Sequence, residues 1–153
     1  MKVRFASDKD SDSVGTLVFE LMTELSAPKP LMVSREEVIQ TARKLLGGST
    51  VWALLAETDE GKPAGVLTLN ACAAVYAGGC FGEITEMFVR PALRGQRVGK
   101  QLLDAAFEFA KKQDWTRLEV CAPPVPPWER SVSFYQQNGF LLLGPRLKFL
   151  LAP

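Results

Sequence analysis

Apolar residues in the first third of the chain recur at helical intervals. Between residues 14 and 25 they occupy every third or fourth position, which predicts an amphipathic helix ended by the prolines that follow. Ser34 and Glu37 have the spacing of a capping box, so a second helix is expected to begin there and to end at the glycines 47–48. A short strand, residues 2–6, is expected before both helices.

The middle of the chain consists of short apolar runs separated by turn residues. Strands are predicted at 51–57, 63–71 and 81–89. The intervening segments 58–62 and 76–79 carry the glycine and polar residues typical of tight turns. These three strands are therefore expected to be neighbours in one sheet.

Helix and strand patterns alternate in the last third. A long amphipathic helix is predicted at 98–113, a strand at 115–121 and a short helix at 129–137. The segments 140–143 and 147–151 flank Gly-Pro and are expected to pair as a closing hairpin.

The element order β-α-α-β-β-β-α-β-α-β-β shows no repeat and no linker. It predicts a single α/β (mixed α+β) domain over residues 1–153, with a central twisted, mostly antiparallel mixed sheet of about six to seven strands covered by about four helices. A composition of 47% hydrophobic and 23% charged residues is that of a globular protein with a sizeable core.

Charge and residue usage exclude several kinds of function. The net charge of +1 argues against nucleic acid or an anionic membrane as a partner. No apolar run reaches the ~18–20 residues that span a bilayer, and the N-terminus lacks the pattern of a signal peptide. Three scattered cysteines indicate reduced thiols, so a cytoplasmic location is expected. The absence of histidine excludes a Ser-His-Asp triad and the usual zinc sites, so no metal is expected.

The loop between the strand 81–89 and the helix 98–113 concentrates positive charge and glycine. Backbone N–H groups at a helix N-terminus lack intrahelical partners, and the helix dipole adds roughly half a positive charge there. Such a site binds phosphate. The expected pyrophosphate cradle comprises Arg94, Gly95, Gln96, Arg97, Val98, Gly99 and Lys100.

The spacing in this cradle differs from two common phosphate loops. A P-loop has four residues between its first glycine and Gly-Lys, followed by Ser or Thr, whereas only three separate Gly95 from Gly99 and Gln101 follows Lys100. The dinucleotide pattern G-x-G-x-x-G is also absent. Nucleoside triphosphates and NAD are therefore poor candidates as ligands.

The cradle resembles the signature of the GNAT superfamily of N-acetyltransferases, Arg/Gln-x-x-Gly-x-Gly/Ala after a strand and at the start of a helix. Arg94, Val98 and Gly99 match it, whereas Arg97 stands in place of the middle glycine. The sequence Met-Phe-Val-Arg-Pro before the loop and Ser-Phe-Tyr-Gln-Gln-Asn-Gly-Phe at 133–140 also resemble family motifs. The resemblance covers the whole chain and implies a GNAT-like acyl-CoA N-acyltransferase fold.

The resemblance implies direct attack of an amine on the thioester of acetyl-CoA, the expected cosubstrate. Tyr135 matches the family tyrosine near the thioester sulfur and would protonate the leaving thiolate. Phe134 precedes it and is expected at the cofactor. Backbone groups of Phe88 and Val89 match those that pair with the pantetheine arm. Many relatives are dimers, so a homodimer is a possible assembly.

Two carboxylates precede the loop in the strand 81–89. An amine with a pKa near 10.4 is mostly protonated at pH 7, and its deprotonation costs roughly 4–5 kcal/mol. Glu83 and Glu86 are both candidates for the base that accepts this proton. Strand alternation would put them on opposite faces unless a bulge intervenes. Glu20 and Glu24 would complete an acidic approach for a cationic acceptor.

Alternatives remain open at this point. The chain would be a CoA-sensing or partner-binding module if it binds the cofactor without turnover. Trp128, in a proline-rich loop, is either a packing residue or part of the acceptor site. The acceptor amine itself, a small molecule or a peptide, has no recognisable code in the sequence.

Overall fold

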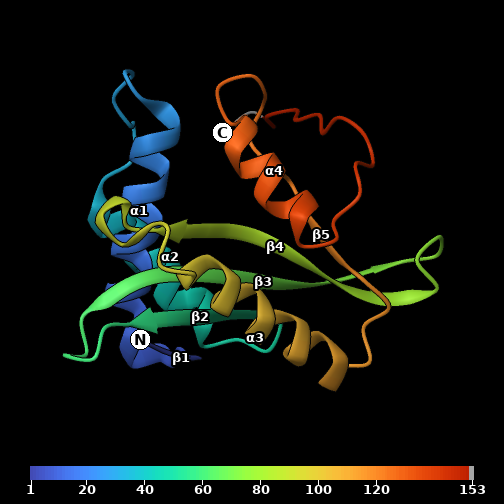
Figure 1. The fold of residues 1–153 in the computed structure, drawn as a ribbon, viewed down its shortest axis with the longest axis horizontal. Coiled ribbons are helices and arrows are strands. Elements are labelled where there is room, and N and C mark those ends of the chain that lie inside the picture. The colour runs from blue at the N-terminus through green and yellow to red at the C-terminus, as the bar shows by residue number, and fades with distance from the viewer. Residues whose placement is uncertain (152–153) are drawn as a thin grey trace. The chain divides into compact units, whose positions relative to one another are not determined.

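The computed structural model of the protein describes residues 1–151 and groups the chain into two compact units. One unit comprises Met1–Val120, and the other begins at Cys121. The first contains a five-stranded sheet with three of the four α-helices, and the second contains the fourth helix (Figure 1).

The sheet has the strand order β1-β2-β3-β4-β5. The first four strands pair antiparallel in chain order, and β5 pairs parallel to β4. The expected mixed, mostly antiparallel sheet is confirmed, with five strands in the described residues rather than six to seven. The strands are β1 (Lys2–Phe5), β2 (Val51–Glu57), β3 (Pro63–Ala74), β4 (Gly79–Val89) and β5 (Leu118–Val120).

Four α-helices and two short 3-10 helices complete the described structure. The capping box predicted at Ser34 is present, because the Glu37 N–H donates to Ser34 Oγ at 3.3 Å and the Ser34 N–H donates to the Glu37 carboxylate at 2.7 Å. The helices are η1 (Asp8–Asp10), α1 (Ser11–Ser26), α2 (Arg35–Leu46), η2 (Pro91–Leu93), α3 (Val98–Lys112) and α4 (Glu129–Gln137).

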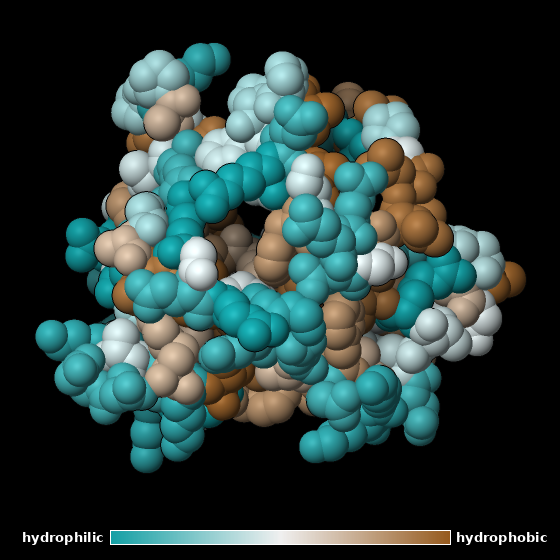
Figure 2. Space-filling model, viewed as in Figure 1, coloured by the Kyte–Doolittle hydropathy of each residue, from teal (hydrophilic) through white to brown (hydrophobic). Residues whose placement is uncertain are grey.

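The predicted hairpin of segments 140–143 and 147–151 is wrong, because neither segment forms a strand. Both segments contain consecutive apolar residues rather than the alternation that gives a hairpin one buried and one polar face. Their side chains are accordingly exposed, with Leu141 at 86% and Leu147 at 91% of full accessibility. Hydrophobic residues lie open along this segment in Figure 2.

Helices α1 and α2 pack on one face of the sheet. Val14 and Leu17 of α1 form a buried cluster with β-strand residues that include Val66 and Phe88, and Ala42 and Leu46 of α2 pack against this cluster. In Figure 1 these two helices lie behind the sheet. The predicted apolar sides of both helices are therefore the sides that form the core.

Helix α3 covers the opposite face, in front of the sheet in Figure 1. Leu102 and Leu103 are fully buried. Phe109 lies 5.0 Å from Trp52 and 5.5 Å from Trp115 between ring centroids, in tilted and edge-on arrangements typical of packed aromatic rings. Trp52 and Trp115 thus have the packing role expected for strand tryptophans.

The outward side of α3 is polar. Asp104, Glu108 and Lys111 are exposed there, with ion pairs Lys100–Asp104 and Lys111–Glu108 along the helix. Hydrophilic residues cover this side in Figure 2. Exposed pairs of this kind add only a few tenths of a kcal/mol each, so the apolar side determines how the helix packs.

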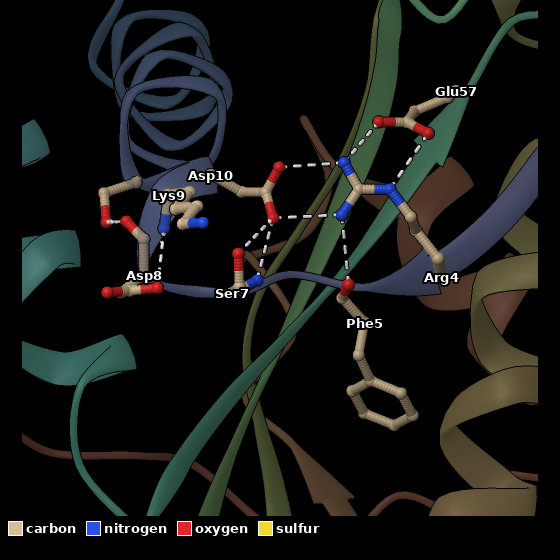
Figure 3. Close-up of polar contacts among 8 residues, drawn as sticks. Arg4, Phe5, Ser7, Asp8, Lys9, Asp10 and Glu57 are labelled. Atoms are coloured by element: carbon tan, nitrogen blue, oxygen red, sulfur yellow. Dashed lines mark hydrogen bonds and ion pairs between the residues drawn. The ribbon is translucent and has the colours of Figure 1, made fainter.

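Arg4 joins the first strand to its neighbours (Figure 3). Its guanidinium donates to Glu57 of β2 at 3.0 and 2.6 Å and to Asp10 of η1 at 2.9 and 2.8 Å. Hydrogen bonding to Arg4 holds the pKa of the Asp10 carboxyl well below its usual range. This network fixes the edge of the sheet to the start of α1.

Candidate functional site

A bulge in β4 determines where its two carboxylates point. Glu86 pairs with Thr68 and Ile84 pairs with Leu69, so Thr85 is an extra residue opposite the β3 backbone. Glu83 pairs with Asn70, on the same side of the sheet as Thr68. Glu83 and Glu86 therefore both lie on the face covered by α1 and α2, and the bulge is the reason.

At the bulge, β4 also loses β5, its neighbour on the side away from β3. β5 pairs only with Gly82–Ile84, and within the unit Met1–Val120 no strand continues this ladder along Thr85–Val89. The Val89 carbonyl lies on that side and accepts from Arg94 Nε at 2.9 Å. An unpaired strand edge offers backbone N–H and C=O groups to an extended ligand. Phe88 is itself buried in the core, so its side chain fixes this edge in place.

The loop after β4 takes a left-handed path twice. Gly95 has φ +82°, and Arg97, the residue before α3, has φ +63° and ψ +11°. Arg97 thus adopts a backbone conformation that favours glycine, the residue of the family motif at this position. For a residue with a Cβ this conformation costs on the order of 1–2 kcal/mol. The loop accordingly keeps a glycine-like path and adds a cation.

The positively charged side chains of the cradle differ in whether they already pair with a carboxylate. Arg94 donates to Glu24 at 2.6 Å and stacks on the Phe88 ring at 5.6 Å, and Lys100 pairs with Asp104. Arg97 has no ion pair within the described residues 1–151 and is exposed. No side chain caps the start of α3 either. The helix N-terminus and Arg97 are therefore open to an anion.

The expected acidic approach from Glu20 and Glu24 is not formed. Glu20 accepts from Arg90 at 3.0 and 2.7 Å, and Glu24 pairs with Arg94. Hydrogen bonding to Glu20 raises the pKa of Arg90. Both carboxylates are thus neutralised and hold α1 against the end of β4, which is a positioning role.

Glu86 lies in a cluster of hydroxyl groups. Thr85 Oγ1 donates to Glu86 Oε2 at 2.7 Å, and the Thr68 hydroxyl donates to the same oxygen. The Glu86 N–H donates in turn to Thr68 Oγ1 at 2.9 Å. Neither threonine was identified from the sequence, because a single Thr in a strand carries no functional pattern. Their hydroxyls orient one carboxylate oxygen of Glu86 and leave the other, Oε1, for a ligand.

A cleft of about 310 Å³ opens at this cluster, between the sheet and the helices α1 and α2. Thr68, Thr85 and Glu86 lie on its sheet side, together with Asn70. Residues of both helices and the start of β2, all apolar except Thr41, form the rest of the wall. A cleft of this size with a few convergent polar groups is the usual form of a small-molecule site.

Glu83 lies further along the same face, outside the cleft lining. Its carboxylate is 3.9 Å from Cys72 Sγ. Burial, followed by the charge of Glu83, raises the pKa of the Cys72 thiol. Cys72 is therefore a neutral thiol, half-buried on this face, and all three cysteines are free, with Cys80 and Cys121 exposed.

Tyr135 and Phe134 belong to the second unit, on α4. The ring of Tyr135 lies 5.5 Å from Phe134 and 5.4 Å from Phe140 between centroids. Tyr135 is 8% exposed, and burial raises its pKa to about 12. Its phenol is therefore protonated throughout the neutral range. Trp128 precedes the first residue of α4.

Residues 1–151 contain no cluster of three or more cysteine, aspartate or glutamate side chains arranged to hold a metal ion. None of the described helices has the length and apolar character needed to cross a membrane.

Known proteins resemble the chain in sequence. The aminoalkylphosphonate N-acetyltransferase of Salmonella typhimurium is 31% identical over 112 residues, which cover 72% of this chain and 67% of the relative.

Solved structures resemble it in fold. A predicted acetyltransferase with acetyl-CoA from Clostridium acetobutylicum has a TM-score of 0.81 at 17% identity, over 97% of this chain and 95% of its own. An aminoglycoside acetyltransferase from an uncultured soil metagenomic sample, in complex with sisomicin, has a TM-score of 0.77 at 18% identity, over 99% of this chain and 95% of its own.

The match to a protein family covers most of the chain, including the β4 bulge, the cradle and the helix that carries Tyr135. Residues 18–140 match the acetyltransferase (GNAT) family, and the chain belongs to this family.

Proposed function

We propose that the protein is an N-acetyltransferase that transfers the acetyl group of acetyl-CoA to a primary amine. The observation that carries the proposal is the bulge at Thr85. It puts Glu86 on the wall of a cleft at the point where the edge of β4 becomes free and the strand runs on to the anion cradle.

Acetyl-CoA would bind along that edge and end at the cradle. Its pyrophosphate would accept from backbone N–H groups at the start of α3 and interact with Arg97. The pantetheine arm would pair with backbone groups of Val89, which face the free edge, whereas those of Phe88 point toward Val66 of β3. A neighbour of the same fold is known with acetyl-CoA, which supports this choice of cosubstrate.

Glu86 would act as the base. The acceptor amine arrives mostly protonated, and its ammonium proton passes to the carboxylate, directly or through water. The free amine nitrogen then attacks the thioester carbonyl carbon, so that a C–N bond forms and the C–S bond breaks. Glu83 lies on the same face but outside the cleft, so its contribution would be smaller.

Tyr135 would act at the leaving group. A phenol with a pKa of about 12 retains its proton near pH 7 and can donate it to the sulfur as the C–S bond breaks. A thiol has a lower pKa, near 8.5, so we expect a strong hydrogen bond to the developing thiolate rather than complete transfer. The attacking nitrogen loses its second proton as the amide forms, and this proton would reach the thiolate through water and complete the CoA thiol.

The experiment is a thiol-release assay with acetyl-CoA and a panel of polyamines, aminoglycosides, amino acids, peptides and simple alkylamines. Release above the no-amine rate is the expected result. We expect Tyr135→Phe to lower kcat by about 10-fold to 100-fold without changing the Kd for acetyl-CoA. Binding of acetyl-CoA without release for any amine would indicate a CoA-sensing module instead.

The three free thiols support a reducing, cytoplasmic setting for this reaction. Gel filtration at several protein concentrations tests the homodimer expected from the family.

A further inference from the structure

The walls of the cleft beside Glu86 are mostly apolar. Seven of the twelve lining residues are Val, Leu or Ala, and four of the others are uncharged polar residues. Glu86 is the only ionisable residue among them. The helices α1 and α2 and the start of β2 contribute eight of the lining residues: Val14, Val18, Val38, Thr41, Ala42, Leu45, Leu46 and Val51.

The polar groups gather at one side of the cleft. Thr68 and Thr85 both direct their hydroxyls at Glu86 Oε2, and no hydrogen bond to Glu86 Oε1 is found within residues 1–151. Glu86 therefore presents one oxygen to a cation, while the walls formed by α1 and α2 are apolar except for Thr41, whose hydroxyl donates to the Glu37 carbonyl at 2.9 Å. A ligand that fits both ends has one positive group and an uncharged body.

The size of the cleft sets a limit on that body. A volume of about 310 Å³ corresponds to roughly ten water molecules at ~30 Å³ each. This is the lower end of the range for small-molecule sites. A hexyl or phenylethyl group is of the right order, whereas a sugar-based amine with several rings is too large.

We propose that the acceptor is a primary monoamine with an apolar alkyl or arylalkyl body, bound with its nitrogen at Glu86 and its body between α1 and α2. The proposal rests on the proposed function, because it assigns the acceptor end of the same reaction. Burial of the apolar body provides affinity, and the single carboxylate fixes which end reacts.

The cleft excludes charged bodies. A second ammonium group would lie against valine and leucine without a partner, and an isolated buried charge is unfavourable by several kcal/mol. A phosphonate would meet the same walls, since the lining contains no Lys or Arg. The acceptor thus differs from the substrates named for the Salmonella relative and for the aminoglycoside acetyltransferase.

Three amines of equal chain length test the proposal. Hexylamine, 1,6-diaminohexane and 6-aminohexanoate each have six carbons and differ at the end away from one amine, where they carry a methyl, an aminomethyl or a carboxylate group. Thiol release from acetyl-CoA should give a kcat/KM for hexylamine at least about 100-fold above that of either charged analogue. Equal or higher values for a charged analogue would overturn the assignment of the acceptor while leaving the acetyltransferase function intact.

Filling the cleft provides a second test. Ala42→Phe should raise the KM for hexylamine about 10-fold or more, and Lys44→Phe, which changes an exposed residue outside the lining of the same helix, should not. Unfolding curves establish that both variants fold, and if Ala42→Phe does not, the three-amine series decides alone. An unchanged KM in a folded Ala42→Phe would place the acceptor elsewhere and refute the proposal.

Direct binding separates the two proposals. Calorimetry with CoA present should detect hexylamine and not 1,6-diaminohexane. Selective binding without turnover of any amine would support the apolar cleft and reject the acetyltransferase activity. Turnover together with equal binding of both amines would support the acetyltransferase activity and reject the apolar cleft as the acceptor site.

Discussion

The two faces of the sheet differ in how they are filled. On the face covered by α3, neighbouring strands contribute Leu67, Leu69 and Ile84, each at most 1% exposed. On the face covered by α1 and α2, the adjacent positions hold Thr68 and Asn70, and a cleft remains. Successive residues of β3 thus alternate between the closely packed face and the face with the cleft.

This difference separates stability from chemistry. Shortening any side chain on a close-packed face lowers the free energy of unfolding. A face with polar groups and a cleft is packed less closely and leaves room for a site. Substitutions on the α3 face should therefore change unfolding, and substitutions of the polar residues around the cleft on the other face should change turnover. The following variants test that division, from the largest expected effect to the smallest.

Glu86→Gln should give the largest loss of activity. Removal of the proposed base should lower kcat/KM by about 10²-fold to 10⁴-fold, while the free energy of unfolding changes little because Gln retains an acceptor for the two hydroxyls. Steady-state kinetics and urea unfolding measure the two quantities. Glu83→Gln is the matched control, and a larger loss in Glu83→Gln would transfer the role of base to that residue.

Leu69→Ala should give the largest loss of stability. Its fully buried side chain leaves a cavity on the packed face, so the free energy of unfolding should fall by about 2–5 kcal/mol. Denaturant unfolding measures this change. Under conditions where the variant remains folded, its kcat should be within about twofold of the original, and a tenfold loss would contradict the division between the faces.

Thr68→Val changes the neighbouring residue on the other face. Valine has the shape of threonine but removes the hydroxyl that donates to Glu86, so kcat/KM should fall about 10-fold. Stability should change by only about 1 kcal/mol. The same kinetic and unfolding measurements apply, and a stability loss as large as that of Leu69→Ala would show that Thr68 serves packing rather than turnover.

Arg97→Gly and Arg97→Ala separate the conformation of the cradle from its charge. Both remove the exposed cation, so the Kd for acetyl-CoA should rise about 3-fold to 10-fold in each. Only glycine adopts the left-handed conformation without strain, so the free energy of unfolding should be about 1 kcal/mol higher for Arg97→Gly than for Arg97→Ala. An unchanged Kd in both variants would remove Arg97 from the cofactor site.

Asp10→Asn tests the ion-pair network of the sheet edge, outside the cleft lining. The pKa of Asp10 is lowered in the folded state, so its contribution is present above the unfolded pKa near 3.9 and is lost as the pH falls below it. Stability at pH 7 should decrease by about 1 kcal/mol, and the difference from the original protein should shrink at pH 3. Thermal unfolding at both pH values measures this, and a difference that grew on acidification would have the wrong sign.

Much of the fold followed from local sequence patterns. The capping box at Ser34, the long helix that begins at Val98 and the β2–β4 strands were predicted because hydrophobic period and capping residues act over a few positions. The predicted C-terminal hairpin is wrong, because whether an apolar run pairs as a strand depends on what covers it.

The site was predictable in part. Residue types and the family motifs point to the proposed cradle and to both candidate carboxylates. The bulge at Thr85, which brings Glu83 and Glu86 to one face, depends on strand register. The pairing of Glu20 and Glu24 with Arg90 and Arg94 joins residues 70 positions apart, and no local pattern reports it.

The most direct test of the proposed activity follows the acetyl group itself. The protein is incubated with isotope-labelled acetyl-CoA and hexylamine, and mass spectrometry measures labelled N-acetylhexylamine alongside the released CoA thiol. We predict equal amounts of the two products, with both nearly abolished in Glu86→Gln. Thiol release without labelled N-acetylhexylamine, or acetyl-CoA binding without either product, would contradict acetyl transfer to this amine.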